Sequence, residues 1–106
     1  MSVNTPLTKT IVINGENFYD LQGFYNEVER VLANGEEWRS NNNLSSFEKL
    51  LAGEGGVLKP GEPAVIIWKN ISKSKSDFYR MSNGSDIYLT IIKIIRSQEH
   101  VKFVEE

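Results

Sequence analysis

Residues 64–68 read Ala-Val-Ile-Ile-Trp, an apolar run in which no polar residue alternates with the hydrophobic ones. A strand with one exposed face alternates between polar and apolar residues, whereas a strand covered on both faces does not. We therefore expect residues 64–68 to form a strand covered on both faces, in the middle of a parallel or mixed sheet. The glycine-rich residues 53–56 and the proline-flanked residues 60–63 precede it as a loop.

Two shorter runs complete the expected sheet. Residues 10–13 are β-branched throughout and end at Asn14-Gly15, a strong turn signal. Residues 101–104 read Val-Lys-Phe-Val and are expected to form the last strand. Trp68, at the end of the central run, is expected to belong to the core.

The pattern predicts two helices between the first two strands. Asp20 is a suitable N-cap for a first helix, which Asn34-Gly35 ends. Positions 21, 24, 25, 28, 31 and 32 are apolar and share one helical face, so Glu27, Glu29 and Arg30 are expected to point outward. A second helix is expected from about residue 43 to residue 52, with apolar residues at 44, 47, 50 and 51.

Two further helices are expected before the last strand. Ser72 or Ser74 is expected to cap a short third helix that runs to about residue 79, with Phe78 as its anchor. Ser85 is expected to cap a fourth helix over residues 87–97. Polar residues recur at 86, 90, 93 and 97, and apolar residues cover most of the remaining circumference, so this helix is expected to be well buried.

The resulting order is β-α-α-β-α-α-β, with helices in pairs between the strands. Such pairs favour parallel strand pairing through right-handed crossovers, so the expected class is α/β. A length of 106 residues allows one modest core and one domain. We expect residues 1–9 to form a flexible leader and residues 10–106 to form the domain.

Composition narrows the class of protein. The chain is 40% hydrophobic and 25% charged, which is typical of a soluble globular protein. No apolar run approaches the roughly 20 residues that span a bilayer, and the first residues lack the pattern of a signal peptide. The chain has no cysteine, which excludes disulfides and cysteine nucleophiles. We expect a cytoplasmic protein with no membrane contact.

Little in the sequence favours catalysis, metal binding or nucleic-acid binding. His100 is the only histidine, lacks companion metal ligands and is expected to be an ordinary surface or strand-edge residue. The net charge of −2 does not favour nucleic acid, and the bases Lys69, Lys73, Lys75 and Arg80 are expected to form a solvated helix face. We expect no enzyme activity, no metal and no cofactor.

Residues 38–53 are the candidate binding segment. A polar loop, with a tryptophan and three consecutive asparagines, leads into the second helix. Trp38 is either an interface anchor or a side chain folded over the first helix, and the sequence leaves both open. The candidate partner-binding residues are Trp38, Arg39, Asn42, Asn43, Ser45, Ser46, Glu48 and Lys49.

The ordered set of these features resembles the barstar family, the intracellular inhibitors of barnase-type ribonucleases. The matching features span roughly residues 10–105 and are Ile13-Asn14-Gly15, Asp20-Leu21, Asn43-Leu44-x-x-Phe47, Val65-Ile66-Ile67-Trp68, Ser74-Lys75 and the closing helix and strand. The resemblance implies a two-layer barstar-like domain with a three-stranded parallel sheet. It also implies a bacterial, non-catalytic ribonuclease inhibitor, in which the second helix and the preceding loop plug the enzyme in a one-to-one complex.

The charges on the inhibitory helix depart from the family. Asn43, Leu44, Phe47 and Leu51 match its scaffold, but Ser45 and Lys49 stand where the family has an acid and its decisive aspartate. Ile94 and Gln98 likewise stand where the last helix has acids. Because a lysine buried against a basic nuclease centre would leave like charges unpaired, we expect the chain not to inhibit barnase itself.

The family fold also serves immunity proteins that neutralise other toxins. The leading hypothesis is therefore an immunity protein of a toxin–antitoxin pair, which occludes a toxin that is a ribonuclease or other nuclease. The alternative is a barstar-fold interaction module or regulator without a toxin partner.

Overall fold

The structure is a computed structural model that describes residues 8–33, 43–80 and 84–106. Its sheet has three strands: β1 (Lys9–Asn14), β2 (Ala64–Lys69) and β3 (Val101–Glu105). The spatial order is β1-β2-β3, and both neighbouring pairs are parallel. The predicted parallel sheet, with residues 64–68 at its centre, is confirmed.

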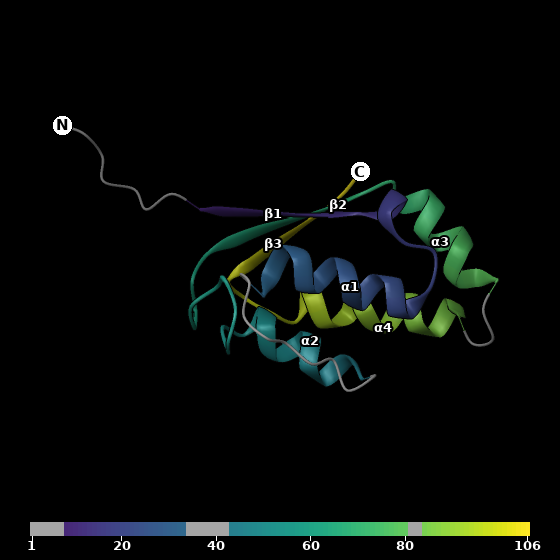
Figure 1. Cartoon of the computed structure of the whole chain (residues 1–106). Coiled ribbons are helices and arrows are strands. Elements are labelled where there is room, and N and C mark those ends of the chain that lie inside the picture. Colours follow the sequence, from purple (N-terminus) through teal and green to yellow (C-terminus); the bar gives the residue numbers. More distant parts are fainter. Residues whose placement is uncertain (1–7, 34–42, 81–83) are drawn as a thin grey trace.

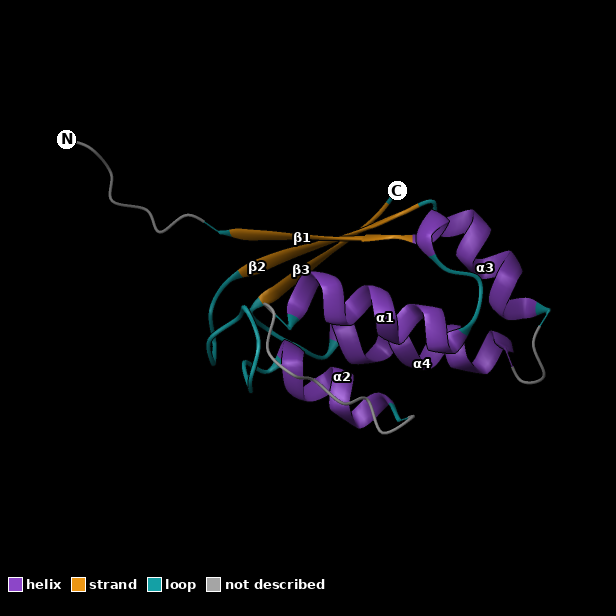
Figure 2. Ribbon diagram, viewed as in Figure 1, coloured by secondary structure: helices purple, strands orange, loops and turns teal. Residues whose placement is uncertain are grey.

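The described residues also form four α-helices, which make up the second layer, and a short 3-10 helix, η1 (Gly15–Asn17), which follows β1. Helices α1 (Leu21–Leu32) and α4 (Gly84–Arg96) lie under the same face of the sheet (Figure 1). Helix α2 (Leu44–Leu51) packs on α1 and α4 and is the helix furthest from the sheet, whereas α3 (Ile71–Tyr79) lies at one end, against α4 and η1. The fold is the predicted two-layer α/β domain (Figure 2).

An aromatic cluster joins the layers. Phe24 of α1 stacks on Trp68 of β2 with ring centroids 5.6 Å apart, and meets Phe47 of α2 edge-on at 5.2 Å. Phe78 of α3 also meets Trp68 edge-on, and all four rings are fully buried. Trp68 and Phe78 are thus core residues, as predicted.

The prediction that β2 is covered on both faces is wrong. Ala64, Ile66 and Trp68 are buried under the helices, but Val65 and Ile67 are only partly buried on the opposite face. Helices α1, α2 and α4 lie on one side of the sheet, and α3 lies at its end (Figure 2). Ile67 is in register with Val12 and Val104, so β-branched side chains of neighbouring strands shield each other on the open face.

The start of α3 also differs from the prediction. The helix begins at Ile71, directly after Asn70, which adopts a left-handed conformation with φ of 57°. Neither Ser72 nor Ser74 is its cap. Ser74 lies inside the helix, fully buried, and its Oγ accepts a hydrogen bond from Trp68 Nε1 at 2.9 Å.

The start of α1 agrees with the prediction, whereas the start of α4 differs from it. Asp20 caps α1 as predicted, since its Oδ1 accepts from the Gly23 N–H at 2.8 Å. Helix α4 begins at Gly84, so Ser85 lies inside the helix and is not its cap. Ile91, Ile92 and Ile95 are buried as predicted, but Leu89 is exposed.

The first strand begins inside the expected leader. Lys9 belongs to β1 and pairs with Ala64, while residues 1–7 lie outside the described residues. Within the described ranges, none of the helices has the length and apolar character needed to cross a membrane.

Candidate functional site

Helix α2, predicted as the binding helix, has a buried and an exposed face. Phe47, Leu50 and Leu51 are buried in the core. Ser45, Glu48 and Lys49 are exposed to solvent, and Ser46 is partly buried. The exposed part of the helix thus offers a hydroxyl, a carboxylate and an ammonium group to a partner.

Asn43 is the N-cap of α2. Its Oδ1 accepts a hydrogen bond from the Ser46 N–H at 3.1 Å, which satisfies one of the free amides of the first helical turn. The side-chain oxygen of Asn43 is therefore engaged in capping the helix, although the side chain is exposed to solvent. Trp38, Arg39 and Asn42, the other predicted binding residues, lie outside the described residues, as does the Asn34-Gly35 helix end.

The carboxyl end of α2 is tied to the turn between α4 and β3. The backbone of Gly53 and Glu54 closes the helix by donating to Leu50 and Lys49 carbonyls. His100 Nε2 lies 2.8 Å from the Leu51 carbonyl oxygen, across 49 positions of sequence. His100 was predicted to be an ordinary surface or strand-edge residue, but it contacts the candidate binding helix.

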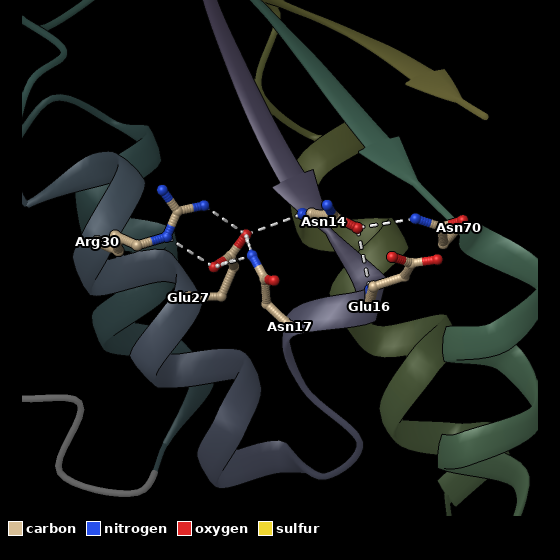
Figure 3. A network of polar contacts seen from close by, with 6 residues as sticks. All are labelled: Asn14, Glu16, Asn17, Glu27, Arg30 and Asn70. Carbon is tan, nitrogen blue, oxygen red and sulfur yellow. Dashed lines mark hydrogen bonds and ion pairs between the residues drawn. The ribbon is translucent and has the colours of Figure 1, made fainter.

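A second polar cluster lies where β1 ends beside α1. Glu27 was predicted to point outward, yet its side chain is only 3% exposed. The prediction is wrong because Glu27 lies on the flank of α1 that faces the end of β1, where donors from other elements surround the carboxylate (Figure 3). Helical periodicity alone does not reveal such donors.

Four nitrogen atoms from three residues donate to the Glu27 carboxylate. The Asn14 N–H donates to Oε2 at 2.9 Å, and Asn17 Nδ2 lies 3.1 Å from both oxygens. Arg30 donates from Nε to Oε1 at 3.0 Å and from Nη2 to Oε2 at 2.9 Å. Asn14 in turn accepts from the Glu16 N–H and from Asn70 Nδ2 through its side-chain oxygen (Figure 3).

The hydrogen bonds decide the ionisation of Glu27. Burial by itself raises the pKa of this carboxyl, but the donors of Arg30, Asn14 and Asn17 outweigh burial and hold the pKa below its ordinary value. The same contact raises the pKa of Arg30. Glu27 and Arg30 are therefore both ionised at neutral pH, and their opposite charges cancel.

Two adjoining hollows lie beside this cluster. A hollow of 360 Å³ is lined by Asn17, Gly23, Asn26, Glu27 and Arg30. A second, of 340 Å³, shares Asn17, Gly23 and Asn26 with the first and is also lined by Phe18, Tyr19, Asp20 and Gln22. Neither hollow was predicted from the sequence, because residue types alone do not indicate how η1 and the start of α1 are oriented relative to each other.

Lys73 and Lys75 of α3 were predicted to belong to a solvated helix face, but both make specific contacts with other elements. Lys73 Nζ donates to the carbonyl oxygens of Gly15 and Phe18 at 3.1 and 2.9 Å and pairs with Asp77 at 2.6 Å, which fixes η1 against α3. Lys75 lies 5.7 Å from the ring centroid of Tyr88. Burial and the nearby charge of Glu105 raise the pKa of Tyr88 to about 12.

Within residues 8–33, 43–80 and 84–106, no group of three or more histidine, aspartate or glutamate side chains is placed to hold a metal ion.

Comparison with protein-family models and with curated proteins found no match to this chain.

Proposed function

We propose that this chain is a non-catalytic inhibitor that binds and occludes a protein toxin, a ribonuclease or other nuclease, as a barstar-like immunity protein. The observation that carries the proposal is the setting of α2. This helix is anchored by three buried residues, lies outermost in the helical layer and presents Ser45, Glu48 and Lys49 to solvent. It is the helix that plugs the enzyme in the family that the sequence resembles.

The charges on α2 specify the partner. Glu48 and Lys49 are adjacent in sequence and diverge by about 100° around the helix, so one partner surface meets them as separate charges. A partner therefore offers a carboxylate or carbonyl acceptor to Lys49. Charge complementarity of this kind speeds association and excludes wrong partners, and it excludes a basic nuclease centre opposite Lys49.

The proposed complex contains one chain and one toxin in the cytoplasm of a bacterium. A rigid, preformed surface lowers the entropic cost of binding, and inhibition by occlusion requires no reacting groups on the inhibitor. The ties at both ends of α2, Asn43 to Ser46 and His100 to Leu51, supply such rigidity.

The test uses the toxin domain encoded beside the gene for this chain. Mixing the two purified proteins is expected to give a one-to-one complex by size-exclusion chromatography with light scattering, with loss of toxin activity at equimolar ratio. A complex that leaves the toxin fully active would instead favour an interaction module or regulator. The absence of any complex with that toxin would reject the proposal.

The placement of the binding face is tested by a second experiment. Trp38→Ala combined with Lys49→Glu is expected to abolish the complex. If this double variant binds the toxin as tightly as the wild type, the face lies elsewhere on the molecule.

A further inference from the structure

Strand β1 is an edge strand, because among the described residues it pairs with β2 alone. Along a strand of a parallel sheet, successive residues turn their main-chain N–H and C=O groups to opposite sides. The Asn14 N–H donates to the Glu27 carboxylate and not to β2 (Figure 3). By this alternation, the main-chain groups of Thr10 and Val12 also turn away from β2, where no described residue bonds to them.

The hydrogen bonds of β2 lead to the same assignment. The Ala64 N–H donates to the His100 carbonyl oxygen, on the side of β3. The Trp68 carbonyl oxygen accepts from the Glu106 N–H on that same side. The residues of β2 that face β1 are therefore 65 and 67. In the observed parallel register these bond to residues 9, 11 and 13 of β1, which leaves 10, 12 and 14 facing outward.

The side chains at the outer edge of β1 do not protect it against pairing. Thr10 is exposed and Val12 is partly buried on the open face of the sheet, and both are uncharged and β-branched. Lys9 carries the only charge within β1, and its Nζ is held 3.3 Å from Glu62. Edge strands are commonly protected by charged side chains. The outer edge of β3 has such protection, because Glu105 forms ion pairs with one cation of α3 and one of α4.

We propose that the outer edge of β1 is a protein-binding surface, which takes an extended segment of a partner protein as an additional strand. The unpaired N–H and C=O groups of an edge strand match those of another strand, and strand addition is a recurring mode of peptide recognition. Glu27 occupies the Asn14 N–H, so the segment pairs with the main chain of Thr10 and Val12. Its side chains beside these two residues are uncharged and β-branched, because opposite side chains of paired strands contact each other.

A single extended segment fits this edge, whereas a second copy of the chain does not. Two copies of β1 that paired antiparallel would carry their helices on the same side of the joined sheet. Helix α1 packs against β1, and its flank already reaches the outer edge where Glu27 binds the Asn14 N–H (Figure 1). The α1 helices of two copies would therefore collide at the junction. An isolated segment brings no helix, and its binding does not depend on what binds α2.

The test is an NMR titration of the isotope-labelled full chain with the uncharged peptide N-acetyl-Thr-Val-Thr-Val-Thr amide. In the free protein, the Thr10 and Val12 amides are expected to exchange rapidly with solvent, and the Ile11 and Ile13 amides slowly, because only the latter bond to β2. The peptide is expected to shift the Thr10 and Val12 amide signals and to slow their exchange, with saturation at roughly millimolar peptide. The amide of Phe103, which faces outward from β3, is the internal control and is expected not to respond.

Two comparisons separate main-chain pairing from other contacts. The same peptide with a methyl group on every backbone nitrogen keeps its side chains but loses its donors, and is expected to bind about tenfold more weakly or worse. Val12→Pro removes one outward N–H. Proline is tolerated on an edge strand at such a position, so the fold is expected to persist while binding falls about tenfold. Val12→Thr keeps the N–H and the branched shape, and as the matched control it is expected to bind like the wild type.

The methylated peptide decides the test even if Val12→Pro fails to fold. The proposal is overturned if the unmethylated peptide leaves the Thr10 and Val12 amides unchanged, or if the methylated peptide binds equally well. An equal response of Phe103 would also overturn it, since β1 would then have no preference over β3. Slow exchange of Thr10 in the free protein, together with a dimer in light scattering, would overturn it as well, because the edge would then be occupied by a second copy.

Discussion

At the scale of single residues, Glu27 shows how a buried charge is accommodated in a small domain. Taking a carboxylate out of water is costly unless donors replace its hydration. The donors come from the β1 end, from η1 and from α1 itself. Because Glu27 receives the Asn14 N–H at the free edge of β1, it also blocks the end of that edge against pairing with another strand.

Removing this carboxylate is expected to destabilise the fold. Glu27→Ala leaves the Asn14 and Asn17 donors without their acceptor, and is expected to lower the free energy of unfolding by about 2 kcal/mol. Urea denaturation measures this loss. Glu29→Ala is the matched control, since Glu29 is exposed two positions along the same helix, and its effect is expected to be much smaller. Equal losses in the two variants would contradict the assigned role.

The same carboxylate predicts a dependence of stability on pH. Folding lowers the pKa of Glu27, so its contribution is fully present above the ordinary value of 4.5 and is lost as the pH falls through the folded-state pKa. The stability advantage of the wild type over Glu27→Gln is therefore expected to shrink as the pH falls from about 6 to about 3. Urea denaturation at a series of pH values tests this, and a constant difference would refute it.

Ser74 satisfies the indole N–H of the fully buried Trp68. Ser74→Ala leaves that donor without a partner, and is expected to cost about 1–2 kcal/mol of unfolding free energy. Ser72→Ala, at an exposed position of the same helix, provides the comparison and is expected to have little effect. If thermal and urea unfolding do not distinguish the two variants, the hydrogen bond contributes nothing measurable.

At the scale of elements, the N-cap determines how firmly the first turn of α2 is held. Asn43→Ala removes the acceptor for the Ser46 N–H, and is expected to destabilise the helix by about 1 kcal/mol. Hydrogen exchange of the first-turn amides of α2 is the direct measurement, with faster exchange expected. Asn43→Asp keeps a side-chain acceptor and is expected to retain the wild-type rates.

The elements themselves follow from local sequence signals. Apolar periodicity predicts α1 and α2, the apolar and β-branched runs predict the three strands, and the helix pairs between the strands predict their parallel pairing. The errors arise where side-chain contacts or backbone conformation override the local pattern. Ser74 has the chemistry of a cap, but the indole of Trp68 takes its hydroxyl, and the left-handed Asn70 starts the helix instead. The apolar run 64–68 indicates burial, yet it does not reveal which face the helices cover.

The candidate site was predictable only in part. The exposed positions of α2 follow from its apolar face, so Glu48 and Lys49 are where the pattern places them. Glu27 and His100 were missed because their partners, the Asn14 amide and the Leu51 carbonyl, are brought to them by tertiary structure. The sequence does not indicate which side chain a given backbone amide or carbonyl will bind.

At the scale of the whole molecule, the two layers have different surfaces. The open face of the sheet carries partly buried aliphatic residues and Lys102, while the helical layer ends in the polar face of α2. We propose that helix α2 is the face that binds a toxin. Lys49 on α2 and Lys102 on the sheet are both exposed lysines, so they form a matched pair on different elements.

The most direct test measures the affinity of the neighbouring-gene toxin for two charge-reversal variants by isothermal titration calorimetry. Lys49→Glu is expected to weaken binding about 100-fold, because it sets like charges against each other in the interface. Lys102→Glu makes the same change of charge away from α2 and is expected to bind as the wild type does. Equal affinity of both variants, or a larger loss for Lys102→Glu, would contradict the claim that α2 is the binding face.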